Sequence, residues 1–217
     1  MSDSLPNTGL PVEEAIAPLR EALSTHRHSV LIAPPGAGKT TLVPLRLLHE
    51  DWVAGRKIVM LEPRRLAARA AAQRMAFMLG EKVGDTVGYQ TRDERKIGAT
   101  TRIEVLTEGI LTRRLQNDPT LDGTALVIFD EVHYINDKDR GHVWEETIIL
   151  LNPNITLVML SATIDKSEEF AKWIGSIRDK KIYLIPTSHR VVPLDHYIYM
   201  NNNIHKIMDT KDNYNKD

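Results

Sequence analysis

The chain has 217 residues, of which 42% are hydrophobic, and a formal net charge of −1 at pH 7. This length predicts one large domain, and the apolar content is sufficient for a buried core. Because the charge is nearly balanced, binding of a polyanion must come from a local basic patch rather than from a bulk field. The chain has no cysteine, which excludes disulfides, thiolate metal sites and thiol nucleophiles.

No apolar run approaches membrane-spanning length, and the beginning of the chain lacks the basic-then-apolar pattern of a secretion signal. The eight histidines do not show the His-Glu-x-x-His spacing of a zinc site. We therefore expect a soluble, cytoplasmic protein without a membrane partner, and a monomer.

Short β-rich apolar runs alternate with amphipathic or alanine-rich helical runs. This pattern predicts strands at residues 30–33, 57–61, 86–90, 102–106, 125–129, 156–160 and 181–185. It predicts helices at residues 12–25, 39–50, 65–79, 108–116, 141–151 and 167–174. The alternation indicates an α/β fold with a mainly parallel central sheet and helices on both faces. Such a sheet binds its ligands at the carboxyl ends of the strands.

The first predicted strand leads into a glycine-rich loop, APPGAGKT, at residues 33–40. Two glycines let the loop turn its N–H groups towards phosphate oxygens, and the following helix adds its positive dipole end. In this pattern the lysine reaches the β- and γ-phosphates and the adjacent threonine hydroxyl binds Mg²⁺. The first position holds Ala33 where the general pattern has glycine. The sequence therefore predicts a site for a nucleotide phosphate chain, with the candidate residues Gly36, Ala37, Gly38, Lys39, Thr40 and Thr41.

Asp130 and Glu131 directly follow the fully apolar strand predicted at residues 125–129. Asp130 is a candidate ligand of Mg²⁺, together with Thr40, because Mg²⁺ prefers a few carboxylates combined with phosphate oxygens. Glu131 is a candidate to orient and polarise the water that attacks a phosphoryl group. An acidic pair at a strand end is also a common solvated arrangement, but the phosphate loop upstream favours the catalytic interpretation.

With His133 added, the chain resembles superfamily 2 helicases of the DExH type. The loop at 33–40 resembles their motif I, Asp-Glu-Val-His at 130–133 their motif II, and Ser-Ala-Thr at 161–163 their motif III. The resemblance implies the first RecA-like lobe of such an enzyme, a three-layer P-loop NTPase fold that binds ATP and Mg²⁺. It assigns catalysis to Glu131, Lys39 and His133, and assigns to Ser161 and Thr163 the coupling between nucleotide state and nucleic-acid binding.

Two further segments imply RNA as a partner. Pro-Arg-Arg at 63–65 resembles motif Ia and Thr-Glu-Gly at 107–109 resembles motif Ib, and in the family both contact the nucleic-acid backbone. The candidate contacts are Arg64, Arg65 and Thr107, together with Arg92, whose charged neighbours also fit a solvated loop. Arg74 falls where DEAH enzymes place an arginine that stacks on adenine. The alternative for Arg74 is an exposed arginine on a helix.

The resemblance changes along the chain, and so does the composition. With LEPRRLAAR at residues 61–69 and VGYQ at 87–90, residues 1–129 resemble bacterial HrpB-type DEAH helicases. With VHYIND at residues 132–137 and GHVWEE at 141–146, residues 130–200 resemble the superkiller type of exosome-associated RNA helicase. Residues 1–129 contain 13 Arg and 4 Lys, and residues 130–217 contain 3 Arg and 8 Lys. We interpret residues 1–200 as one lobe with a chimeric seam near residue 130, and residues 201–217 as a disordered tail or truncated linker.

Complete enzymes of this superfamily bind ATP between two RecA-like lobes, and the second lobe carries arginines that complete the site. The 217 residues contain no Gln-x-x-Gly-Arg-x-Gly-Arg pattern. We therefore expect weak binding of ATP and Mg²⁺, with slow or absent hydrolysis, and list the second lobe among the partners. Two alternatives stay open: a chimeric nucleotide-binding module without catalysis, and the lobe of a DNA translocase, because backbone contacts alone do not settle the sugar preference.

Overall fold

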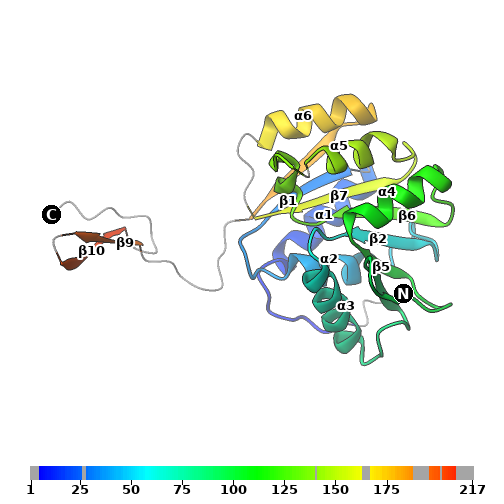
Figure 1. Ribbon diagram of the computed structural model, residues 1–217, viewed down its shortest axis with the longest axis horizontal. Coiled ribbons are helices and arrows are strands. Elements are labelled where there is room, and N and C mark those ends of the chain that lie inside the picture. Colours follow the sequence, from blue (N-terminus) through cyan, green and yellow to red (C-terminus); the bar gives the residue numbers. More distant parts are fainter. Residues whose placement is uncertain are drawn as a thin grey trace.

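The computed structural model describes residues 5–25, 28–139, 141–162, 167–187, 196–200 and 202–208. Eight strands form one sheet in the order β4-β3-β5-β2-β6-β7-β1-β8 (Figure 1). All neighbours are parallel except β3 and β4, which are antiparallel. The strands are β1 (His28–Ile32), β2 (Lys57–Leu61), β3 (Val87–Gln90), β4 (Arg95–Lys96), β5 (Ile103–Leu106), β6 (Thr124–Phe129), β7 (Thr156–Ser161) and β8 (Ile182–Pro186).

Helices cover both faces of the sheet (Figure 1). The cores place α1 (Glu13–Thr25), α2 (Lys39–Leu47) and α3 (Arg65–Leu79) on one face, and α4 (Glu108–Asn117), α5 (Gly141–Leu150) and α6 (Ser167–Arg178) on the other. Alternate side chains of each strand enter the two cores, so β6 is apolar along its length. Trp144 of α5 is fully buried, as its amphipathic surroundings suggest. The predicted α/β fold is confirmed.

The predicted elements match the observed ones closely, and β2 and α3 have the expected bounds. The largest difference is at α6, which continues to Arg178 rather than ending at residue 174. The guanidinium group of Arg178 is buried and donates hydrogen bonds to the carbonyl oxygens of Leu151, Asn152 and Ile155. These contacts come from a loop that is distant in sequence, so the local sequence pattern could not predict where α6 ends.

Three segments were not expected from the sequence, and the shortest is the two-residue strand β4 (Arg95–Lys96). A short 3₁₀ helix, η1 (Val132–Asn136), follows motif II, and β9 (His196–Met200) pairs with β10 (Asn203–Met208) in a separate antiparallel hairpin. The strand β10 falls within residues 201–217, where a disordered tail or truncated linker was expected, and pairing with β9 supplies its backbone partners. Residues 209–217 lie outside the described part of the chain. No helix within the described ranges is long and apolar enough to cross a bilayer.

Candidate nucleotide and nucleic-acid site

The sheet brings the sequence motifs to one edge. The phosphate loop follows β1, Asp130 follows β6 and Ser161 ends β7, and these three strands are neighbours. Thr107 follows β5 on the other side of β2 and β6. Because the strands are parallel, their carboxyl ends meet at the same edge. The topology therefore collects segments that are far apart in sequence.

The phosphate loop has the backbone that its glycines predict. Gly36 has a φ of 77° and Gly38 a φ of 91°, a region that side-chain-bearing residues rarely adopt. A Cβ on Gly38 would also lie 2.7 Å from a methyl carbon of Leu10. The loop ends at the first residue of α2, whose N-terminal amides are those that bind anions in other proteins. The loop geometry thus fits a phosphate chain.

Lys39 is buried, with 6% of its surface exposed. Its Nζ atom donates hydrogen bonds to the carbonyl oxygens of Ala33, at 2.6 Å, and Pro34, at 3.1 Å. Burial lowers the pKa of Lys39, whereas the charges of Glu131 and Asp130 act in the opposite direction. The ammonium group is therefore held inside the loop close to both acidic residues, where phosphate oxygens would replace the carbonyl groups as partners.

Asp130 supplies the best evidence for a cation at this edge. Its side chain is 1% exposed, and burial raises its pKa above the ordinary value, an effect that the neighbouring Thr40 hydroxyl opposes. Its Oδ1 atom accepts a hydrogen bond from the N–H of Glu131 at 3.0 Å. Among the described residues, its Oδ2 atom has no hydrogen-bond partner of ordinary geometry. A buried carboxylate oxygen beside a threonine hydroxyl is a donor set that fits Mg²⁺.

Glu62 is a second buried carboxyl group at the same place. It directly follows β2, is 2% exposed, and adjoins Asp130. Burial and the Asp130 charge raise the pKa of Glu62 to about 8, although Arg64 partly opposes this change. Sequence reasoning treated this residue only as part of the segment before Arg64. Within the described ranges its ion-pair partner is Arg64, whose side chain is 58% exposed, and this distinguishes it from a carboxylate paired with a buried cation.

Glu131 is connected to motif III through His133. The backbone of Glu131 is left-handed, with a φ of 52°, which is unusual for a residue with a side chain. The Nδ1 atom of His133 lies 3.3 Å from Oε2 of Glu131 and 3.4 Å from Oγ of Ser161. Ser161 is buried, and its carbonyl oxygen accepts a hydrogen bond from the N–H of Ala33 at 3.0 Å. Motifs I, II and III are therefore in direct contact.

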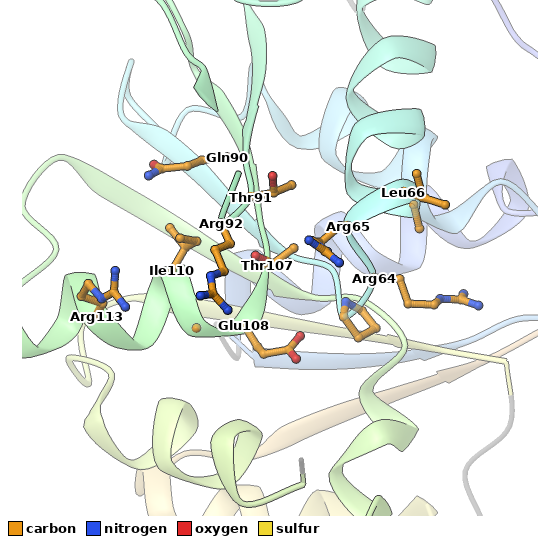
Figure 2. Close-up of a pocket in the computed structure, with 13 residues that line it drawn as sticks. Arg64, Arg65, Leu66, Gln90, Thr91, Arg92, Thr107, Glu108, Ile110 and Arg113 are labelled. Carbon is orange, nitrogen blue, oxygen red and sulfur yellow. The ribbon is translucent and has the colours of Figure 1, made fainter. Parts of the chain in front are cut away.

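A hollow of about 1220 Å³ lies beside this edge and is lined by motifs Ia and Ib (Figure 2). We call it the arginine groove. Its four arginines come from three segments: Arg64 and Arg65 at the start of α3, Arg92 after β3, and Arg113 in α4. Thr107 lies in the same wall (Figure 2). Arginines arranged in this way suit a phosphate backbone, which attracts cations irrespective of sequence.

The arginines differ in how they are neutralised. Arg65 forms an ion pair with Asp93, and Arg64 lies 3.9 Å from Glu62. Arg92 and Arg113 are exposed, and within the described ranges neither has an ion-pair partner. The sequence analysis missed Arg113, although its place one turn into the helix after motif Ib was a usable signal. Its neighbour Arg114 turns towards the protein interior instead.

Three predicted site residues remain without a contact that would test their roles. Arg74 is exposed on α3, and its guanidinium carbon lies 5.5 Å from the centre of the Phe77 ring. Among the described contacts, none joins Arg74 to the phosphate loop. Thr41 lies in the first turn of α2, and its hydroxyl group donates to the carbonyl oxygen of Gly38 at 3.5 Å. Thr163 lies outside the described residues.

Comparison with known proteins gives one consistent family. Residues 13–170 match the family model of DEAD/DEAH box helicases. The chain is 45% identical over 165 residues to the ATP-dependent RNA helicase HrpB of Escherichia coli, covering 73% of this chain and 20% of that protein. It is 40% identical over 116 residues to Superkiller complex protein 2 of Homo sapiens, covering 54% of this chain and 9% of that protein.

A crystal structure of E. coli DExH-box NTPase HrpB superposes with a TM-score of 0.74 and 38% identity, covering 88% of this chain and 23% of that one. The chain therefore spans about a fifth of the length of this relative. The match to HrpB spans 165 residues, more than the 129 that precede residue 130. The match to Superkiller complex protein 2 spans 116 residues, more than the part of the chain from residue 130 onwards. The likenesses to the two relatives thus overlap within the lobe.

Proposed function

Because the chain belongs to the DEAD/DEAH box helicase family, we propose that it works as the ATP-binding lobe of an RNA helicase. In this role, ATP hydrolysis is coupled to movement along the nucleic acid. The observation that supports it most strongly is the meeting of Lys39, Asp130 and Glu131 at one sheet edge, next to the arginine groove. A simple anion site would need neither the buried aspartate nor the adjoining groove.

Each residue has a task that follows from its position. Lys39 and the amides of the phosphate loop hold the β- and γ-phosphates, and Thr40 and Asp130 are the residues that would hold Mg²⁺. When bound, this ion neutralises charge that develops on the transferred phosphoryl group. Glu131 orients a water molecule for in-line attack and accepts its proton. His133 fixes the Glu131 carboxylate and transmits its position to Ser161.

We propose weak ATP binding and slow turnover for this lobe by itself. In helicases of this type, as the resemblance implies, a second lobe closes the ATP site and supplies arginines to the phosphates. Such an arginine accelerates phosphoryl transfer by about 10³–10⁵. RNA bound to the arginine groove would likewise contact only one wall of its full path. RNA-stimulated hydrolysis by this polypeptide at helicase-like rates would contradict this part of the proposal.

We also propose that two related sequences join near residue 130. The change from arginine and alanine to lysine and asparagine supports this origin. The overlapping likenesses are compatible with it, because homologous halves of one lobe share core positions and loop lengths. A single natural parent gene that contains both halves together would contradict the proposal.

Two substitutions test the assignment of the site. Lys39→Ala should abolish binding of a fluorescent ATP analogue, because it removes the ammonium group from the phosphate loop. Glu131→Gln should retain binding and lose any phosphate release, because the amide cannot accept the proton of the attacking water. Glu168→Gln, on the exposed side of α6, is the control and should change neither measurement. If phosphate release persists in both site variants, it does not arise from this site.

A further inference from the structure

The end of β2 lies between the nucleotide site and the arginine groove. Glu62 occupies this position, with Asp130 beyond the end of the neighbouring strand β6 and Arg64 two residues further along its own chain. Register pairs Leu61 with Phe129, so the residues that follow, Glu62 and Asp130, come side by side. The chain thus places one carboxyl group between a candidate magnesium ligand and the first arginine of the groove.

The backbone at Glu62 is held from both sides. Its N–H donates to the carbonyl oxygen of Leu106 at 2.9 Å, and the N–H of Asp130 donates to the carbonyl oxygen of Leu61 at 2.9 Å. Leu106 leads directly to Thr107 in the wall of the groove. The following Pro63 further restricts the backbone of Glu62 to extended conformations. The Glu62 side chain therefore starts from a fixed point and has little freedom to leave this junction.

The Glu62 carboxyl group has one contact on each side. Its Oε1 atom accepts a hydrogen bond from the N–H of Arg64 at 3.3 Å and lies 3.9 Å from Nε of the same residue. On the other side it adjoins the Asp130 carboxyl group, whose Oδ2 atom lacks a hydrogen bond of ordinary geometry to any described residue. A buried polar group without a partner is costly, so this oxygen favours an added cation.

We propose that Glu62 is a positioning residue that couples the magnesium–nucleotide site to the arginine groove. A cation at Asp130 would draw the aspartate oxygen towards itself and away from the hydrogen bond that Asp130 and Glu62 share. Glu62 then holds the Arg64 backbone and guanidinium group more firmly, and Arg64 presents a better defined wall to RNA. By reciprocity, RNA held by Arg64 favours the arrangement that accepts the cation.

The inference rests on the proposed function, since it requires both ligands to bind this lobe. The test measures the dissociation constant of a fluorescent ATP analogue with Mg²⁺, with and without saturating oligouridylate. In the wild-type chain we expect oligouridylate to tighten nucleotide binding by about 5-fold or more, the lower end of typical coupling between sites. The same titration with Mg²⁺ omitted should show a factor close to one.

Two variants separate positioning from a general effect on the fold. Glu62→Ala should bring the coupling factor close to one while keeping the midpoint of thermal unfolding near that of the wild type. Glu62→Gln should retain most of the coupling, because an amide can still accept from the Arg64 N–H and donate to Asp130. Glu168→Gln is again the control. Should Glu62→Ala fail to fold, Glu62→Asp gives the same comparison, because its shorter side chain cannot reach both neighbours.

The outcomes distinguish the two proposals. A wild-type chain that binds neither ATP nor oligouridylate would overturn the proposed function, and the inference with it. A wild-type chain that binds both without coupling, or a Glu62→Ala variant with undiminished coupling, would overturn the inference alone. A loss of coupling in Glu62→Ala with rescue in Glu62→Gln would support it, since a purely structural defect would not depend on RNA.

Discussion

The sheet contains two clusters of buried carboxyl groups, and their partners differ. Glu104 in β5 is neutralised by the protein itself: Lys57 donates to its Oε1 atom at 2.6 Å, and Arg114 forms an ion pair with its Oε2 atom. Glu62 and Asp130, also buried, adjoin one another, and the charge of Asp130 acts on the ammonium group of Lys39 in the phosphate loop. The Glu104 cluster is complete without a ligand, and we propose that a cation from outside completes the cluster of Glu62 and Asp130.

The acidities of the two clusters follow from this difference. Burial raises the pKa of Glu104, but the hydrogen bonds from Lys57 and Arg114 outweigh it and leave the pKa below its ordinary value. Burial raises the pKa values of both Glu62 and Asp130, and the charge of Asp130 adds to the rise at Glu62, as that of Glu131 does at Asp130. Burial of an acidic residue therefore does not identify a site. A buried acid without its own cation is a much stronger indication of a bound ligand.

The largest expected effect is on stability, and it falls on the self-neutralised cluster. Glu104→Ala should lower the free energy of unfolding by about 2–3 kcal/mol, because it removes two charge-assisted hydrogen bonds and leaves a cavity. The partly exposed side chains of Lys57 and Arg114 can turn to solvent, which keeps the cost below that of a fully buried pair. Denaturant unfolding without ligands gives the value.

Glu62→Ala is the matched variant from the other cluster. It should cost less than about 1 kcal/mol, because removing a buried carboxyl group that lacks a strong ion pair offsets the lost packing. Equal losses of stability in the two variants would show that the clusters do not differ as proposed.

The sequence predicted the elements of the site better than their contacts. The phosphate loop is local: two glycines, a preceding apolar strand and a following helix together specify its shape. Asp130 and Glu131 were likewise predictable, because a fully apolar strand can end at only one edge of a covered sheet. The bounds of β2 and α3 were also predicted without error.

The contacts that depend on sheet order were beyond a local pattern. Glu62 and Asp130 are separated by more than sixty residues, and only the pairing of β2 with β6 makes them neighbours. The strand β10 depends on pairing with β9, and neither the composition nor the length of β10 predicts a strand. The end of α6 depends in the same way on carbonyl groups of a loop that packs against Arg178.

The pH dependence of stability should separate the two clusters by sign. Glu104 has a lowered pKa in the folded chain, so its contribution is present above the ordinary value of 4.5 and is lost as the pH falls below it. Glu62 has a raised pKa of about 8, so its ionisation progressively destabilises the folded chain as the pH rises from 4.5 towards 8. The wild type should therefore lose stability relative to Glu62→Gln over this upper range.

Denaturant unfolding of the wild type, Glu104→Gln and Glu62→Gln across both ranges, without Mg²⁺ or nucleotide, makes the comparison. The advantage of the wild type over Glu104→Gln should stay constant above pH 5 or so and shrink in acid. If the wild type became more stable relative to Glu62→Gln as the pH rises to 8, the pH dependence would have the opposite sign to the one expected. Such a result would show that Arg64, whose Nε atom lies 3.9 Å from Oε1 of Glu62, outweighs burial and the Asp130 charge.

The smallest expected effect concerns two adjacent arginines, which repeat the same contrast on the basic side. Arg114 turns inward to Glu104 and also donates to Oε1 of Gln90 at 2.8 Å, whereas Arg113 is exposed in the arginine groove. Arg113→Ala should weaken oligouridylate binding several-fold and reduce the slope of log affinity against log salt by about 0.7, one phosphate contact. Arg114→Ala should lower stability instead and leave that slope unchanged.

The slope is the decisive measurement, because a shift of Gln90 in Arg114→Ala could alter affinity without changing the number of neutralised phosphates. If Arg114→Ala reduced the slope and Arg113→Ala did not, the inward arginine would be the one that binds RNA. An ion pair with another residue of the chain would then no longer separate structural from functional residues here.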